Sequence, residues 1–180
     1  MNKIQKLSKF LKYIFYAGAI TKILIPVSIF LSHSALLLSK GHSTHTELPI
    51  SIDKYLSFSF GHKALVALSA LPSEIMYSIS LVFIAKLLHL YEKRDYFSLK
   101  TARYFGNIGK FFIFSVLVSF PQEILFSYVV TMNEPKGERF IRFSASNHDF
   151  SGIMFALMII LVGWVMKEAV KIKCEQDLTV

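Results

Sequence analysis

The chain has 180 residues, of which 53% are hydrophobic and only 18% are charged. A soluble domain usually carries about 25% charged residues, so this composition excludes an ordinary water-soluble domain. The net charge of +8 would suit nucleic-acid binding, but the basic residues stand at the ends of apolar stretches and form no stripe interleaved with aromatic residues. We therefore expect a membrane protein that does not bind nucleic acid directly.

Four long apolar stretches predict four membrane-spanning helices, because a helix needs roughly 20 residues to cross about 30 Å of hydrocarbon. The spans are predicted at residues 13–38, 64–91, 111–132 and 150–170. The expected fold is an all-α four-transmembrane-helix bundle that forms a single membrane domain over residues 1–180. An inner loop at 92–110 and outer loops at 39–63 and 133–149 connect the helices.

The first stretch favours a retained span over a cleaved signal peptide. Lys3 to Lys12 followed by an apolar run imitates a signal peptide. The run is longer than the about 7 to 15 residues expected of one, and Lys22 interrupts it.

The first outer loop contains His42 and His45, whose imidazoles are weak candidates for metal ligands. No cysteine accompanies them in this loop and no ligand pair repeats at a fixed interval. A solvated loop is therefore the favoured interpretation, and we predict neither a metal nor a cofactor.

The same loop then alternates apolar and polar residues, a pattern typical of a strand. The apolar positions are Ile50, Ile52, Leu56, Phe58 and Phe60. A comparable run at 139–144 in the second outer loop follows the turn signal of residues 134–137. The two runs predict a small extracytoplasmic β element that covers the outer face.

The inner loop predicts a helix that begins after Ser98, a suitable N-cap, and continues into the third span. In such a helix Leu99 and Ala102 would face lipid headgroups or the bundle, while Lys100, Arg103 and Lys110 would face the cytoplasm.

The distribution of Lys and Arg predicts the topology, because positive residues are retained on the cytoplasmic side. Twelve lie in the N-terminal segment, the inner loop and the C-terminal tail, against six in the two outer loops. Both termini are therefore expected in the cytoplasm. This places Cys174, the sole cysteine, in a reducing compartment.

Three ionisable residues fall deep inside the predicted spans: Lys22, Glu74 and Glu123. Counted from the inner ends of their spans at 1.5 Å per residue, they lie about 15, 21 and 18 Å deep. A charge at a helix centre costs about 2.5 to 3.5 kcal/mol. We therefore expect Lys22 to pair with Glu74, Glu123 or both, with Gln122 as a further hydrogen-bond partner.

Two interpretations of this buried cluster stay open. Pro26, Pro72 and Pro121 each interrupt one of the first three spans, and kinked helices together with charges are able to form a cavity for an ion or small solute. The alternative is a structural ion pair that only orients the helices. The sequence contains no phosphate-binding glycine loop, G-x-S-x-G elbow or H-E-x-x-H helix, so we expect no enzyme activity.

The segment Tyr91–Gly109, which contains Tyr96-Phe97-Ser98, and the tail Trp164–Val180 resemble the bacterial domain-of-unknown-function 2975 membrane proteins. Two departures stand out: Arg94-Asp95 replaces a common glycine, and Cys174 replaces an acidic residue. The resemblance implies four spans and an inner-membrane location. It also implies a regulatory partner, because such proteins are often encoded beside small helix-turn-helix regulators. It implies no established activity.

The expected function is therefore that of a non-catalytic inner-membrane protein that engages a cytoplasmic regulatory partner. The alternative is a small transporter or ion-binding protein that uses Lys22, Glu74 and Glu123. The residues expected to form the partner surface are Lys93, Arg94, Lys100, Arg103, Lys110, Glu175 and Asp177.

Overall fold

The computed structural model describes residues 3–31, 55, 57–135, 137–141, 143 and 147–177. The described part is mainly helical, with four long helices, α1 (Lys3–Leu31), α4 (Leu71–Glu92), α5 (Leu99–Thr131) and α6 (Asn147–Asp177), and a short helix, α3 (Phe60–Ser69).

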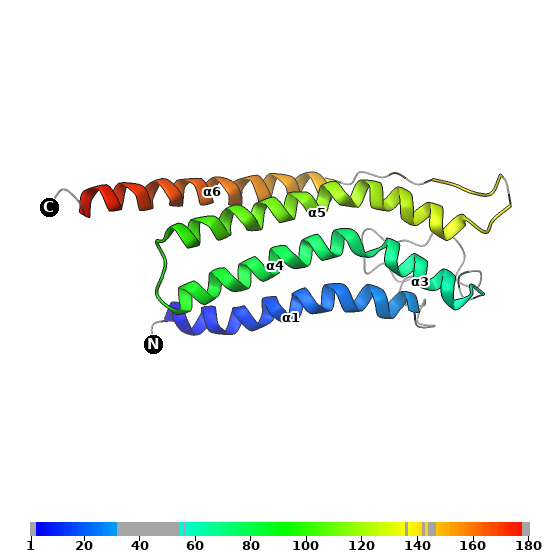
Figure 1. Ribbon diagram of the computed structural model, residues 1–180, viewed down its shortest axis with the longest axis horizontal. Coiled ribbons are helices and arrows are strands. Elements are labelled where there is room, and N and C mark those ends of the chain that lie inside the picture. Colours follow the sequence, from blue (N-terminus) through cyan, green and yellow to red (C-terminus); the bar gives the residue numbers. More distant parts are fainter. Residues whose placement is uncertain are drawn as a thin grey trace.

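The long helices lie side by side in chain order, each antiparallel to the one before it (Figure 1). Helix α1 packs on α4, α4 on α5, and α5 on α6. Both termini and the α4–α5 connection lie at one end of the molecule (Figure 1), which we call the basic end. Among the described helices, α1 and α6 do not pack on each other, so the bundle is open along one side.

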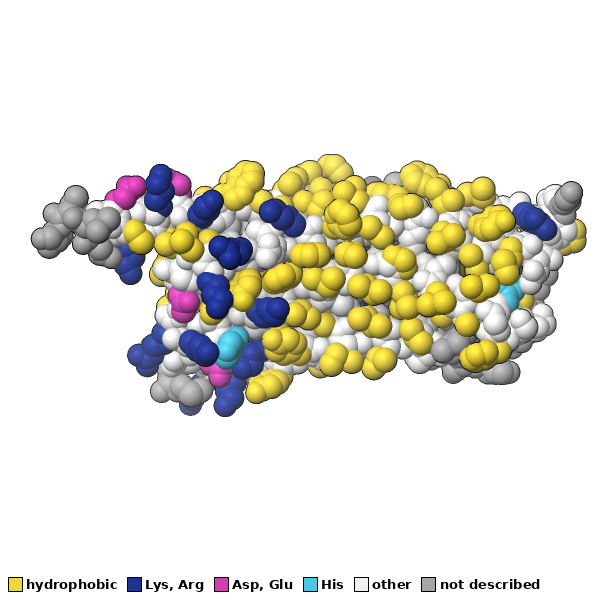
Figure 2. Space-filling model, viewed as in Figure 1, with side chains coloured by type: hydrophobic (Ala, Val, Ile, Leu, Met, Phe, Trp, Pro, Cys, Tyr) yellow, Lys and Arg dark blue, Asp and Glu magenta, His cyan; other side chains and the backbone are white. Residues whose placement is uncertain are grey.

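Four of these helices are long and apolar enough to cross a membrane. Large apolar side chains such as Leu24, Leu117 and Leu161 are more than half exposed, whereas small residues such as Ala19 and Ala156 are buried. On the face shown in Figure 2, hydrophobic side chains cover the middle, and most Lys and Arg side chains gather at the basic end. Because lipid, unlike water, solvates exposed apolar side chains, the chain is a multi-pass membrane protein.

Hydroxyl groups join neighbouring helices inside the bundle. The hydroxyl of Ser78 on α4 donates to the carbonyl oxygen of Ala19 on α1 at 3.0 Å, and that of Ser80 donates to Ile108 on α5 at 3.2 Å. In a span each such bond satisfies a polar group that lipid cannot satisfy. These two bonds therefore fix α4 between α1 and α5.

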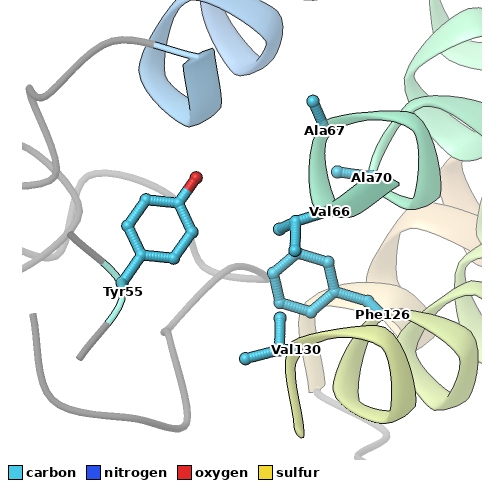
Figure 3. Packing of buried hydrophobic residues seen from close by; sticks show 6 residues of the cluster. All are labelled: Tyr55, Val66, Ala67, Ala70, Phe126 and Val130. Atoms are coloured by element: carbon cyan, nitrogen blue, oxygen red, sulfur yellow. The ribbon is translucent and has the colours of Figure 1, made fainter. Parts of the chain in front are cut away.

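A cluster of buried apolar residues lies at the end opposite the basic end, which we call the far end. Phe126 and Val130 of α5 point toward Val66 of α3, as Figure 3 shows. Tyr55 is fully buried in the same cluster. This cluster attaches the short helix α3 to α5.

The β element predicted for the outer loops is wrong for the residues that the structure describes. Tyr55 is helical, Phe58 lies in a bend, and Phe60 begins α3. In a strand, the side chains of Phe58 and Phe60 would lie on the same face and that of Tyr55 on the opposite face. Instead, Tyr55 is fully buried and Phe60 is 73% exposed. In the second loop, residues 139–141 and 143 form no strand. The remaining residues of both runs lie outside the described part.

The helix bounds refine the predicted spans. The second span, predicted as one helix, is divided at Ala70 into α3 and α4, with Pro72 in the first turn of α4. By contrast, α1 and α5 continue through Pro26 and Pro121. The predicted helix start after Ser98 is confirmed, since the Ser98 hydroxyl accepts from the Thr101 backbone N–H at 3.2 Å.

Candidate functional site

The structure brings together Lys22 of α1 and Glu74 of α4. The Lys22 ammonium lies 3.5 Å from Glu74 Oε2 and 5.0 Å from the centre of the Tyr77 ring. The two charged side chains remain 48% and 29% exposed. This pair therefore lies at membrane depth without being sealed inside the bundle.

The pair lines a cavity of about 330 Å³. All four long helices contribute to its wall, so residues far apart in the sequence meet there. The lining residues are Lys22, Ser73, Glu74, Tyr77, Phe112, Ser115, Val116, Ser119, Asp149 and Gly152.

Asp149 is the ionisable lining residue that the sequence reasoning did not single out. It lies in the first turn of α6, where the helix dipole favours a negative charge, and it is only 8% exposed. Its position just before the fourth apolar stretch suggested a loop end at the membrane surface. The signal available in the sequence was an acidic residue directly before an apolar stretch, where the first turn of a helix is expected.

Gln122 and Glu123, the other two members of the predicted cluster, are not among the described residues that line the cavity. The Gln122 amide oxygen accepts from the Ser73 backbone N–H at 2.6 Å, and its Nε2 donates to the Ala70 carbonyl at 3.0 Å. Gln122 thus bridges the break between α3 and α4. Glu123 is half-buried on α5.

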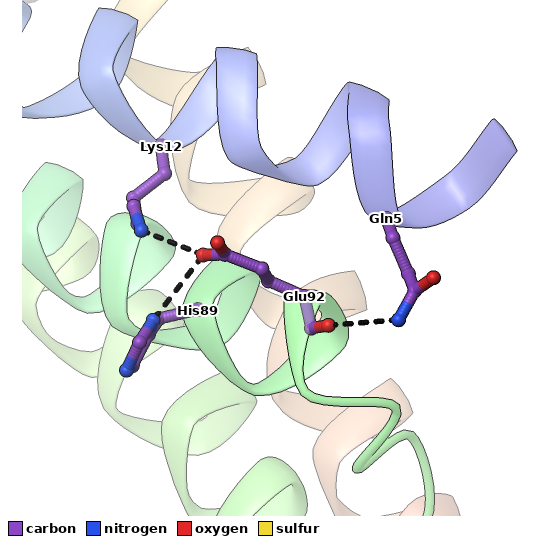
Figure 4. Close-up of polar contacts among 4 residues, drawn as sticks. All are labelled: Gln5, Lys12, His89 and Glu92. Atoms are coloured by element: carbon purple, nitrogen blue, oxygen red, sulfur yellow. Dashed lines mark hydrogen bonds and ion pairs between the residues drawn. The ribbon is translucent and has the colours of Figure 1, made fainter. Parts of the chain in front are cut away.

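A second polar cluster joins α1 to the end of α4 (Figure 4). Lys12 Nζ lies 2.6 Å from Glu92 Oε2, and His89 Nδ1 lies 3.4 Å from the same oxygen. The Gln5 side chain donates to the Glu92 carbonyl at 3.1 Å. Sequence reasoning missed this cluster, although Glu92 standing three residues after His89 was a usable signal.

The connection from α4 to α5 is ordered by backbone hydrogen bonds. The N–H of Arg94 donates to the carbonyl of Tyr91 at 3.1 Å, and that of Asp95 donates to Leu90 at 3.0 Å. These two bonds form a Schellman motif, in which the residue after the C-cap adopts the left-handed conformation and is usually glycine. That residue is Arg94, with φ of 67°.

Side chains complete the same connection. The Ser98 hydroxyl donates to Asp95 Oδ2 at 3.0 Å, and the Thr101 hydroxyl donates to the Asp95 carbonyl at 3.1 Å. Thr101 is fully buried. The connection is therefore a fixed turn that presents its outward side chains in defined positions.

The residues predicted as a partner surface lie at the basic end. Phe97 and Leu99 lie in the same segment and are 63% and 55% exposed, so apolar and basic side chains are mixed there. The predicted residues with exposed side chains are Lys93, Arg94, Lys100, Arg103, Lys110 and Glu175. Asp177 ends α6, and its side chain lies outside the described part.

The predicted weak metal ligands His42 and His45 lie outside the described residues, and the described part contains no group of side chains suited to a metal ion.

At the far end, His62 Nε2 lies 2.7 Å from the Val129 carbonyl and its Nδ1 lies 3.0 Å from Asn133 Nδ2. Since the carbonyl only accepts, Nε2 carries the proton and Nδ1 accepts from the Asn133 amide. Burial raises the pKa of Tyr55, in the same region, to about 12.

Comparison with known proteins places the chain in a family. A family model described as "Protein of unknown function (DUF2975)" matches residues 42–180, which is more than half of the chain. Neither the curated proteins nor the solved structures with which the chain was compared contain a match. The family match confirms the resemblance seen in the inner loop and the tail. The chain therefore belongs to the DUF2975 family.

Proposed function

We propose that this multi-pass protein resides in the bacterial inner membrane, is not a catalyst, and binds a cytoplasmic regulatory protein at its basic end. The observation that carries the proposal is Arg94, an exposed arginine in a left-handed backbone conformation that glycine would adopt without strain. A side chain kept at a strained position suggests a role for that side chain.

The orientation follows from charge. Lysines and arginines gather at the end that carries both termini (Figure 2). Positive residues are retained on the cytoplasmic side during insertion, so this end faces the cytoplasm in the proposal. The Arg94 turn would then be accessible to cytoplasmic proteins.

The chemistry of the surface defines the partner. Lys100 and Arg103 on the first turns of α5 are exposed, as is the apolar Phe97 just before this helix. A matching partner presents an acidic surface around an apolar pocket, since complementary charge steers association and apolar contacts hold it. The family resemblance suggests a small helix-turn-helix regulator as that partner.

The test first looks for a gene of a helix-turn-helix regulator beside the gene of this protein, as expected from the resemblance, and then measures binding of that regulator to the full-length protein in nanodiscs. Arg103→Glu should weaken binding at least about tenfold, because it reverses a charge at the proposed interface. Arg139→Glu is the matched control, since it makes the same charge change on an exposed residue at the far end. Equal weakening by both variants, or no binding to the wild-type protein, would reject the proposal.

A second candidate function is supported by the cavity around Lys22 and Glu74. Charged residues at membrane depth often mark ion or solute sites, and here they line a volume of about 330 Å³. If the cavity serves transport, Glu74→Gln should abolish proton or solute flux into proteoliposomes while the protein stays folded. A lower melting temperature with unchanged flux would instead assign the Lys22–Glu74 pair a structural role.

A further inference from the structure

We propose that the cavity binds a small organic cation with a primary ammonium group, at the position that the Lys22 ammonium itself occupies. The inference rests on the second proposed function, in which the cavity is a ligand site. In this view Lys22 is a tethered competitor that fills the cation position until a ligand displaces it.

The contacts of Lys22 are those that recognise an ammonium ion. A carboxylate supplies the opposite charge, here Glu74 at 3.5 Å, and an aromatic face supplies a cation–π contact, here Tyr77 at 5.0 Å. The cavity therefore already holds one ammonium group, and it belongs to the protein.

The Lys22 ion pair is longer and more exposed than the Lys12–Glu92 ion pair, which also joins α1 to α4. The Lys22 side chain is 48% exposed and lies 3.5 Å from the Glu74 carboxylate. Lys12, in the cluster at the basic end, is 12% exposed and lies 2.6 Å from Glu92. We therefore expect a ligand ammonium to replace the Lys22 ammonium more readily than it would replace the Lys12 ammonium.

The charge of the lining favours a cation. Two carboxylates, Glu74 and Asp149, line the cavity with a single basic residue, Lys22, among the described lining residues. The described lining therefore contains more carboxylates than ammonium groups.

The uncharged lining favours a primary ammonium with an apolar body. The hydroxyls of Ser115 and Ser119 each donate at 2.7 Å to a carbonyl of their own helix, so they offer the cavity lone pairs that accept from N–H groups. Tyr77 and Phe112, with ring centres 5.5 Å apart, form an aromatic wall for the rest of the ligand.

The test uses three probes of similar size that differ in charge: phenethylammonium, phenylacetate and 2-phenylethanol. Their binding to the full-length protein in nanodiscs is measured by calorimetry. The wild-type protein should bind phenethylammonium more tightly than the other two. Lys22→Met should bind phenethylammonium about tenfold more tightly, because the tethered competitor is gone.

Three further variants make the test specific. Glu74→Gln should weaken phenethylammonium binding about tenfold, since a charge-assisted hydrogen bond is lost. Tyr77→Leu should weaken it without changing any charge, which covers the case that Glu74→Gln does not fold. Lys86→Met is the control: Lys86 lies 5.3 Å from the Phe83 ring and is not a described lining residue, so affinity should not change.

Weaker or unchanged phenethylammonium binding in Lys22→Met would overturn the proposal, as would the absence of binding to the wild-type protein. Binding of phenylacetate or 2-phenylethanol that Lys22→Met abolishes would also overturn it, while leaving the cavity a ligand site. The flux assay on Glu74→Gln tests that underlying function independently of the probes.

Discussion

At the scale of single residues, Arg94 combines a backbone conformation that favours glycine with a long charged side chain. It occupies the left-handed position of a Schellman motif with φ of 67°, where a residue with a Cβ is strained by about 1 to 2 kcal/mol. Glycine would remove this strain and lose the charge. The two effects are separable by mutation, so this position tests whether the arginine serves stability or binding.

Arg94→Gly should therefore raise the free energy of unfolding by about 0.5 to 1 kcal/mol, since relief of strain exceeds the entropy lost by glycine. Thermal unfolding in detergent measures the change as a higher melting temperature. Arg94→Ala is the control, because it removes the same charge but keeps a Cβ in the left-handed region. A melting temperature that rises equally in both variants would contradict the explanation.

Part of the candidate site was predictable from the sequence, through its charged residues inside the predicted spans. The rarity of charges in spans singled out Lys22 and Glu74, which the structure places 3.5 Å apart. The same reasoning could not assign Gln122, because its partners are backbone groups exposed by the break at Ala70. Asp149 was not predicted because its depth depends on where α6 packs along α5.

At the scale of elements, the break between α3 and α4 depends on α5. Ser73 lies in the first turn of α4, where backbone N–H groups have no partner within the helix. Gln122 supplies the acceptor from the neighbouring helix and also binds the carbonyl of Ala70. A side chain on α5 thus performs the capping that Ala70 cannot.

Gln122→Leu should lower the free energy of unfolding by about 1 to 3 kcal/mol, because the Ser73 N–H and the Ala70 carbonyl lose their partner. Ser119→Ala on the same helix is the control. The Ser119 hydroxyl bonds only to the Val116 carbonyl of its own helix among the hydrogen bonds described, so its loss should change stability by less than about 0.5 kcal/mol. Chemical denaturation in mixed micelles compares the variants, and equal effects would rule out the capping role.

The contact between α5 and α6 requires glycine at position 109 of α5 but not at position 106. A Cβ added at Gly109 would lie 2.7 Å from the backbone oxygen of Ala156, whereas one added at Gly106 would meet nothing within 4 Å. Backbone atoms cannot move aside cheaply. Small residues of this kind allow membrane helices to approach closely.

Gly109→Ala should accordingly destabilise the protein by about 1 to 3 kcal/mol through overpacking. Gly106→Ala should be neutral or stabilising by up to about 1 kcal/mol, since alanine has the higher helix propensity. Melting temperatures of the two variants in one detergent give the comparison. Equal destabilisation of both would contradict the close approach of α6 to α5 at Gly109.

Apolar periodicity and length identified the helices but not all of their limits. The Ser98 cap predicted the start of α5 because its signal is local. The alternating pattern around Tyr55 predicted a strand that the described residues do not form. Alternating apolar residues also occur in other segments, where contacts with other helices determine which side chains are buried. In this chain the aromatic ring of Tyr55 enters the α3–α5 cluster, and Phe60 becomes the first residue of a helix.

At the scale of the whole molecule, the helices form a row that is open between α1 and α6. The cavity with Lys22 and Glu74 lies among all four long helices, while the exposed basic residues gather at the end that carries both termini. Composition and apolar length were sufficient to predict the membrane class. The openness of the row was not predictable, because apolar helix faces look alike whether they meet lipid or another helix.

The orientation of the chain underlies the proposal of a cytoplasmic partner, and the only cysteine of the chain offers a direct measurement of it. Cys174 is exposed near the end of α6. In intact spheroplasts, a membrane-impermeant maleimide should leave Cys174 unlabelled and should label it after permeabilisation. A Glu138→Cys variant in a Cys174→Ser background, with the new thiol at the far end, should be labelled without permeabilisation. Labelling of Cys174 in intact spheroplasts, or protection of the thiol at position 138, would contradict a cytoplasmic basic end.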